Sequence, residues 1–276
     1  MHYLFFKHAL VKNFISHNDI VWFLLIAAFQ LFAVAYLYRA YSRNFFISVF
    51  LFIASGDYLA WVHNGMRQFL AVSIVLFSFR YIIEKQYIKA VIVILIASCL
   101  HGSALIMLPL IFVVQGKAWN LRTVLMIISA IIAVLFIDKT TSLLETVLVN
   151  TQYEGLINNY IWEADNGTSM FRAIVYSIPA VLSILGKRYV DAEKDTILNI
   201  SINCSIVSAA LYWLSVFTSG IYIGRLPIYV SLWGYIAIPA VIESMFTEQS
   251  SKLVYMSMGI LYVIYFYYQL IAWGLT

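Results

Sequence analysis

Arg67 stands at the junction of two apolar runs, in the segment Asn64-Gly65-Met66-Arg67-Gln68. An arginine costs free energy within hydrocarbon, so an arginine beside a membrane segment is a candidate for function. Its planar guanidinium can bind a phosphate through two parallel hydrogen bonds, and Asn64 and Gln68 could contact the same substrate. The alternative interpretation is an interfacial arginine whose side chain extends to the lipid headgroups.

A second arginine, Arg225, precedes Tyr229 by four residues. If a helix begins near Ile223, these two side chains share one helix face. Arg225 could then supply a second cation for a diphosphate, with Tyr222 or Tyr229 packed against a sugar. An interfacial anchor is again the alternative.

His101 is followed by Gly102 and Ser103 in the most apolar part of the chain. A histidine there could move a proton or donate a hydrogen bond to a phosphate or sugar oxygen, and Ser103 could bind the same group. The alternative is a structural hydrogen bond to a neighbouring helix. No second histidine or carboxylate lies nearby at ligand spacing, so the sequence predicts no metal site.

Several acids and one further arginine are weaker candidates. Asp57 lies within an apolar run, where a carboxylate usually faces the interior of a helix bundle; it could pair with Arg67 or act as a general base. Glu154 is a second candidate base, and Glu163 and Asp165 lie in the same polar stretch. Most acids in such a stretch are merely solvated. Arg172 opens the next apolar run and is a candidate substrate-binding residue.

The composition requires a lipid environment around the elements that carry these residues. The chain has 276 residues, of which 63% are hydrophobic and 11% charged, whereas soluble domains average about 25% charged residues. A soluble fold of this size cannot bury so much apolar surface. A soluble enzyme, a disordered chain and a nucleic-acid-binding protein are therefore excluded, and the net charge of +4 reports membrane topology instead.

Hydropathy predicts one all-helical membrane domain over residues 1–276, because backbone groups in lipid must be satisfied within helices. Long apolar runs of about 17 residues or more are candidate spans. They cover 20–38, 45–62, 67–83, 88–115, 122–137, 171–186, 197–218, 223–242 and 253–273. The acidic segment of about 138–170 is predicted to be an external loop.

The run 88–115 is long for one helix and short for two, and its middle contains His101. A single crossing leaves nine of the 17 basic residues inside: Lys7, Lys12, Arg67, Lys117, Arg122, Lys187, Arg188, Lys194 and Lys252. A turn at His101 leaves eleven inside: Arg39, Arg43, Arg80, Lys85, Lys89, Lys117, Arg122, Lys187, Arg188, Lys194 and Lys252. The positive-inside bias favours the turn. We therefore expect about eight full crossings plus a short re-entrant hairpin, with Arg67, His101 and Arg225 converging on the external face.

The residues around Arg67 and His101 resemble the EpsG-type branch of the bacterial polysaccharide polymerases. The pattern is Asn-x-x-Arg-Gln-x-x-Ala, a basic loop, and then Leu-His-x-Ser-Ala. It is formed here by Asn64, Arg67, Gln68 and Ala71, by Lys85 and Lys89, and by Leu100, His101, Ser103 and Ala104. Arg225 with Tyr229 is similar to a later Arg-x-x-x-Tyr segment of that family. The resemblance covers roughly residues 45–270.

The resemblance implies a Wzy-like, multi-pass glycosyltransferase of the bacterial inner membrane. Such an enzyme joins oligosaccharide repeat units carried on undecaprenyl diphosphate into O-antigen, capsule or exopolysaccharide at the external face. It implies no cofactor, and it implies a chain-length regulator and a flippase of the same pathway as partners. Members usually begin with further helices that carry a Gly-x-Asp and Tyr-rich segment, which is not found here, so the general base stays open between Asp57 and Glu154.

Two other functions compete with a polymerase. A transporter or flippase of lipid-linked sugars would also need arginines in a cavity, but it usually shows paired internal repeats, and none is apparent. A membrane acyltransferase would use a histidine in an apolar helix together with a nearby polar partner. No Walker loop, HExxH or GxSxG motif is present.

Overall fold

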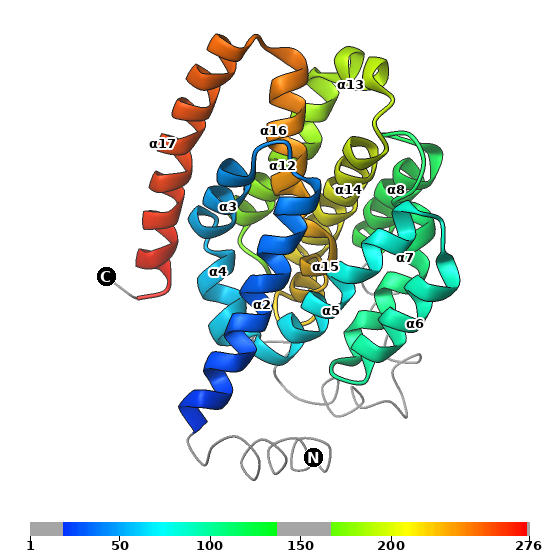
Figure 1. Cartoon of the computed structure of the whole chain (residues 1–276), viewed down its shortest axis with the longest axis vertical. Helices are drawn as coiled ribbons and strands as arrows, with labels where there is room; N and C mark the ends of the chain where they lie inside the picture. The colour runs from blue at the N-terminus through cyan, green and yellow to red at the C-terminus, as the bar shows by residue number, and fades with distance from the viewer. Residues whose placement is uncertain (1–18, 137–166, 275–276) are drawn as a thin grey trace.

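The computed structural model describes residues 19–136 and 167–274, and the regular elements within these ranges are all helical (Figure 1). The first half contains α2 (Asp19–Tyr41), α3 (Phe45–Ala54), α4 (Asp57–Leu59), the π-helical turn η1 (Ala60–Asn64), α5 (Met66–Ile83), α6 (Tyr87–Ser98), η2 (Gly102–Ile106), α7 (Met107–Val113) and α8 (Leu121–Leu135). The second half contains α12 (Met170–Leu185), α13 (Lys187–Glu193), α14 (Thr196–Val216), η3 (Ile223–Arg225), α15 (Ile228–Ser231), α16 (Gly234–Met245) and α17 (Glu248–Ala272). The all-helical fold predicted from hydropathy is confirmed.

Four described helices are long and apolar enough to span a membrane: Ile20–Tyr41, Met66–Ile83, Thr196–Val216 and Glu248–Ala272. Three bent pairs raise the number to seven if each pair is one span. The bends are 67° between Phe45–Ala54 and Asp57–Asn64, 73° between Met170–Leu185 and Lys187–Glu193, and 49° between Ile223–Ser231 and Gly234–Met245. The sequence predicts about eight crossings for the whole chain, and the predicted acidic loop falls largely outside the described residues.

The core of the bundle forms around α14, which is buried along almost its full length. The indole of Trp233 is fully buried and lies against Phe79, with 4.5 Å between the ring centroids. Helices α2 and α17 lie at the periphery (Figure 1) and expose apolar side chains such as Phe32 and Leu261. Exposed apolar faces on peripheral helices are typical of a protein surrounded by lipid.

The chain turns back near His101, as the distribution of basic residues predicts. Helix α6 ends at Ser98, and a short break leads into η2, which packs back against α6. Figure 1 shows α6 and α7 side by side, on the side of the bundle opposite α17. The run 88–115 is therefore a helical hairpin and not one crossing.

The described cations separate between the two ends of the bundle. The eleven residues predicted to face the cytoplasm lie at the ends of α2 and α5, at the starts of α6, α8, α13 and α17, or in the connections next to them, and the alternating helix directions put these positions at one end of the bundle. We call this the basic end. Arg67, Arg172 and Arg225 are the other described cations, and they lie near the breaks at the opposite end. The alternation of helix directions thus gathers the candidate residues at one end.

Candidate functional site

His101 lies at the centre of a hydrogen-bonded group that joins three distant segments. Its Nδ1 is 2.7 Å from the hydroxyl oxygen of Ser103, which is 2.9 Å from the hydroxyl oxygen of Tyr229. The side-chain amide of Gln68 donates to Ser103 Oγ at 3.3 Å and to the backbone carbonyl of Arg225 at 2.9 Å. We call these five residues the His101 cluster. The predicted convergence of the Arg67, His101 and Arg225 segments is confirmed.

Local sequence explains how these groups are presented. Gln68 is in the first turn of α5, directly after Arg67. Arg225 ends the 3₁₀ turn η3, and Pro227 caps the short helix that carries Tyr229. A proline is tolerated at a helix start because the missing N–H has no helical acceptor there. Gln68 and Tyr229 are thus held in the first turns of helices, where the backbone N–H groups also lack acceptors within the helix.

The charges of two arginines, Arg67 and Arg225, act on His101. Among the described residues, neither Arg67 nor Arg225 has an ion-pair partner. His101 is half-buried in the break between α6 and η2, outside the helices. Burial and the charges of Arg67 and Arg225 lower the pKa of His101. The histidine is therefore held in its neutral form beside two cations, an arrangement that can take a proton and stabilise an anion.

A second polar group surrounds Asp57, which is fully buried. Its carboxylate accepts hydrogen bonds from Trp61 Nε1 at 3.2 Å, from the Tyr235 hydroxyl at 2.8 Å and from the Tyr176 hydroxyl. Arg172 completes the group, with its guanidinium nitrogen 3.6 Å from Asp57 Oδ1. We call these residues the Asp57 cluster.

The predicted pairing of Asp57 with Arg67 is wrong, because Arg172 takes that place. Arg172 lies over the rings of Tyr176 and Tyr212, with its guanidinium carbon 5.5 and 5.6 Å from their centroids. Two aromatic faces and a carboxylate compensate the partial loss of hydration around this cation, whose side chain is 25% exposed. Asp57 and Arg172 lie far apart in the sequence, so residue spacing alone could not predict that they pair.

The backbone at Gly56 creates the space for this cluster. Gly56 has a φ of +78°, and a Cβ there would stand 2.7 Å from Gln269 Nε2 and 3.1 Å from Trp273. Gln269 in turn donates to the carbonyl of Ser55. The left-handed turn ends α3 and starts α4, which explains the bend that puts Asp57 inside the bundle.

Between the two clusters, loop 219–225 packs on residues 167–168 through glycines, and we call this contact the glycine joint. A Cβ on Gly220 would stand 2.7 Å from the Gly167 carbonyl oxygen, and one on Gly167 would stand 2.6 Å from the carbonyl oxygen of Val216. A Cβ on Gly224 would collide with the Thr168 hydroxyl. Backbone packs directly on backbone here, so the start of α12 and the start of η3 are fixed relative to each other.

The other predicted residues have varied placements. Asn64 ends the π-helical turn and is exposed, and in the described part of the chain no hydrogen bond joins it to the His101 cluster. Tyr222 precedes η3, and its backbone N–H donates to Ser219 Oγ. Glu154, Glu163 and Asp165 lie outside the described residues.

Sequence reasoning missed the aromatic partners of Asp57. Trp61 lies four residues after Asp57, and Tyr176 four residues after Arg172, so the i,i+4 rule for helices could have indicated both. Tyr235 and Tyr212 carried no comparable signal, because their contacts depend on how the helices pack.

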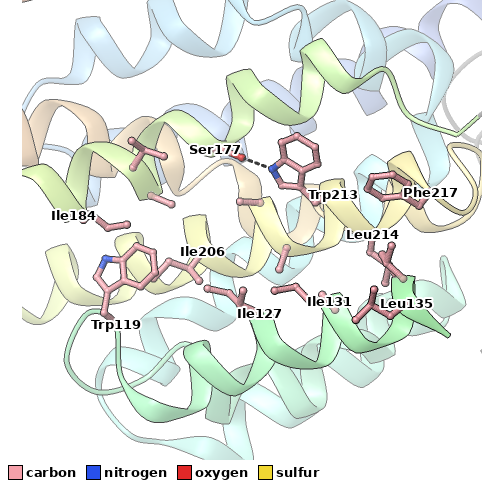
Figure 2. Close-up of a pocket in the computed structure, with 16 residues that line it drawn as sticks. Trp119, Ile127, Ile131, Leu135, Ser177, Ile184, Ile206, Trp213, Leu214 and Phe217 are labelled. Atoms are coloured by element: carbon pink, nitrogen blue, oxygen red, sulfur yellow. Dashed lines mark hydrogen bonds between the residues drawn. The ribbon is translucent and has the colours of Figure 1, made fainter. Parts of the chain in front are cut away.

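A groove lined by apolar side chains crosses the lipid-facing side of the bundle between α8, α12 and α14. Figure 2 shows Trp119 near one end of it, and Leu135 and Phe217 near the other. Its volume is about 450 Å³, and the indole of Trp213 at its wall donates to Ser177 Oγ at 3.0 Å. The groove offers almost no polar contact, which suits a hydrocarbon chain.

The described residues contain no group of three or more His, Cys, Asp or Glu side chains that could hold a metal ion. No curated protein and no solved structure matches the chain. The family model described as the EpsG family matches residues 3–274. That match covers nearly the whole sequence and includes both clusters. This multi-pass helical membrane protein therefore belongs to the EpsG family.

Proposed function

We propose that the chain is a polysaccharide polymerase that uses a polyprenyl-diphosphate-linked donor. The family suggests polysaccharide biosynthesis by a glycosyltransferase-like polymerase. In the proposed step, the bond between the donor sugar and the diphosphate breaks, and an acceptor hydroxyl forms a new glycosidic bond. The bonding electrons leave with the carrier diphosphate, and the acceptor proton passes to a base.

The observation that carries this proposal is the His101 cluster together with Arg67 and Arg225, which have no ion-pair partner among residues 19–136 and 167–274. Gln68 donates to both the Ser103 hydroxyl and the Arg225 backbone carbonyl, and the charges of Arg67 and Arg225 both act on His101, which supports one shared site. Charge that develops on a leaving diphosphate is best stabilised by fixed cations where water is scarce. We propose that Arg67 and Arg225 bind the diphosphate.

We assign the general base to His101. Its lowered pKa keeps the imidazole able to accept a proton near neutral pH. Asp57 is less suited, because its oxygens already bind Trp61, Tyr176, Tyr235 and Arg172. In our proposal Asp57 positions Arg172 and does not touch the reacting atoms.

We further propose that the carrier is undecaprenyl diphosphate and that its hydrocarbon occupies the apolar groove between α8, α12 and α14. The groove faces the bilayer, and its Phe217 end lies close to loop 219–225. With the basic end in the cytoplasm, we propose that the reaction takes place at the external face of a bacterial inner membrane.

The test is a series of single alanine variants, Arg67→Ala, His101→Ala and Arg225→Ala, in cells that make the surface glycan. Loss of one charge-stabilising group typically lowers a rate roughly 100-fold or more. We therefore expect the polymer ladder on a gel to collapse to single repeat units, with normal protein levels.

Arg80→Ala is the matched control, because Arg80 is an exposed arginine at the basic end that pairs with Glu84. It should leave the ladder unchanged. Normal ladders from all three site variants would overturn the proposal. Repeat units trapped on the inner face would instead indicate a flippase, and full-length polymer without acyl groups an acyltransferase.

A further inference from the structure

A separate cavity of about 320 Å³ opens beside the Asp57 cluster, at the start of α12 and the end of α17. Its walls combine one cation, three aromatic rings and small polar groups. They are formed by Gly167, Thr168, Ser169, Arg172, Gly220, Ile221, Tyr265, Tyr268, Gln269, Ala272 and Trp273. A volume of this size is within the range of about 300–1,000 Å³ that is typical of small-molecule sites.

The charge of this cavity differs from that of the His101 cluster. The guanidinium of Arg172 is balanced by Asp57, 3.6 Å away, whereas Arg67 and Arg225 have no ion-pair partner among the described residues. Arg172 Nε is buried and, within the described part of the chain, has no hydrogen-bond acceptor. Arg172 lines the cavity with a guanidinium whose charge Asp57 already balances, which favours a neutral polar ligand over a diphosphate.

The rings favour a ligand with both apolar faces and hydroxyl groups. Tyr268 and Trp273 line the cavity and are 45% and 38% exposed, and each ring combines an apolar body with a polar group. Tyr268 is held edge-on by Phe171, with 5.0 Å between the centroids. Fixed amphipathic rings beside a hydrogen-bond donor match a pyranose, which has C–H faces and an equatorial rim of hydroxyls.

Loop 219–225 connects the cavity to the His101 cluster. Gly220 and Ile221 line the cavity, and the carbonyl of Arg225 at the other end of the loop accepts from Gln68. A saccharide whose diphosphate lies at Arg225 would reach the cavity along this loop. We propose that the Arg172 cavity binds sugar residues of the lipid-linked repeat unit, as a subsite distinct from the diphosphate site. The proposal rests on the proposed polymerase function.

The test measures binding of the phosphate-free repeat-unit oligosaccharide, prepared from the organism's own surface polysaccharide, to the purified full chain by saturation-transfer NMR. Tyr268→Ala and Trp273→Ala should each weaken binding roughly fivefold or more, because one aromatic contact is lost. Tyr268→Phe keeps the ring and should keep most of the affinity.

Tyr267→Ala is the matched control, because Tyr267 neighbours Tyr268 on α17 but does not line the cavity and is 59% exposed. It should bind like the wild type. Equal affinity in wild type, Tyr268→Ala and Trp273→Ala would overturn the subsite, and so would an equal loss in Tyr267→Ala.

Arg67→Ala separates this proposal from the proposed function. It should bind the phosphate-free saccharide normally, since it lies outside the cavity. Intact binding in Arg67→Ala together with intact polymer ladders would refute the polymerase site but leave the saccharide subsite standing. Loss of saccharide binding in Arg67→Ala would overturn the separation of the two subsites.

Discussion

A carboxylate with no exposed surface lies beside a cation in the Asp57 cluster, and removal of either charge leaves the other uncompensated. Breaking a buried ion pair from one side typically costs about 3–5 kcal/mol, more than the pair itself contributes. The cluster is therefore a sensitive point of the fold as well as a neighbour of the proposed sugar subsite.

Asp57→Asn should lower the free energy of unfolding of the purified protein by about 3–5 kcal/mol, since Arg172 would lose its only ion-pair partner among the described residues. Denaturant titration in detergent measures the change. The double variant Asp57→Asn/Arg172→Met should recover part of the loss, because no unpaired charge remains.

Glu84→Gln is the matched control, as it removes one carboxylate from the exposed pair with Arg80. Such pairs contribute only about 0–1 kcal/mol. Equal effects of Asp57→Asn and Glu84→Gln would contradict a buried, energetically coupled Asp57–Arg172 pair.

At the residue scale, the sequence indicated more of the His101 cluster than of the Asp57 cluster. Arg67, His101 and Arg225 stand out because each interrupts apolar sequence, and Gln68 follows within the same motif. The partners of Asp57 are tyrosines, and tyrosine is common in this chain, with 20 residues. A tyrosine that binds a carboxylate cannot be told from one that faces lipid without knowledge of helix packing.

At the scale of elements, hydropathy predicted the long helices well but not their breaks. Helix α14 is close to the predicted run 197–218, and α2 to 20–38. The run 45–62 is instead two helices bent by 67°. Gly56 supplied a visible signal for that bend, whereas nothing in the residue pattern indicated the π-helical turn that follows.

The groove between α8, α12 and α14 gives a prediction about helix faces. Ala130→Phe adds a ring to the lining and should compete with a bound hydrocarbon. Overfilling a packed site costs about 1–3 kcal/mol, which corresponds to roughly 5- to 150-fold weaker retention. The amount of polyprenyl phosphate that copurifies with the protein measures the effect.

Ile128→Phe is the control on the same helix, since Ile128 is exposed and does not line the groove. It should retain the wild-type amount of lipid. If both variants copurify with the same amount as the wild type, the hydrocarbon does not occupy this groove.

At the scale of the whole molecule, the distribution of charge orients the protein. Basic loops remain cytoplasmic, so the end that carries Arg67, His101 and Arg225 should face outward. Cys99 lies at that end, directly before the hairpin turn, and its thiol is exposed, whereas Cys204 is buried. The chain therefore carries a natural reporter of its topology.

A membrane-impermeant maleimide should label Cys99 in intact cells whose outer membrane, if present, is permeabilised. In a Cys99→Ala background, Lys85→Cys at the basic end should react only in inverted vesicles. Mass spectrometry of the labelled peptides measures both. If Lys85→Cys were labelled from outside, and Cys99 of the wild type were not, the protein would have the opposite topology. That result would contradict an external site.

The glycine joint between residues 167–168 and loop 219–225 also limits how the gene can change. Glycine is the smallest amino acid, so every missense mutation in codons 167, 220 or 224 adds atoms where backbone or a hydroxyl already occupies the space. The neighbouring cavity wall at Tyr268 has room for exchange. After selection for function, a saturation-mutagenesis library should therefore contain few substitutions at the three glycine codons and more at the cavity wall around the saccharide. Sugar specificity could then change in evolution while the glycine joint stays the same.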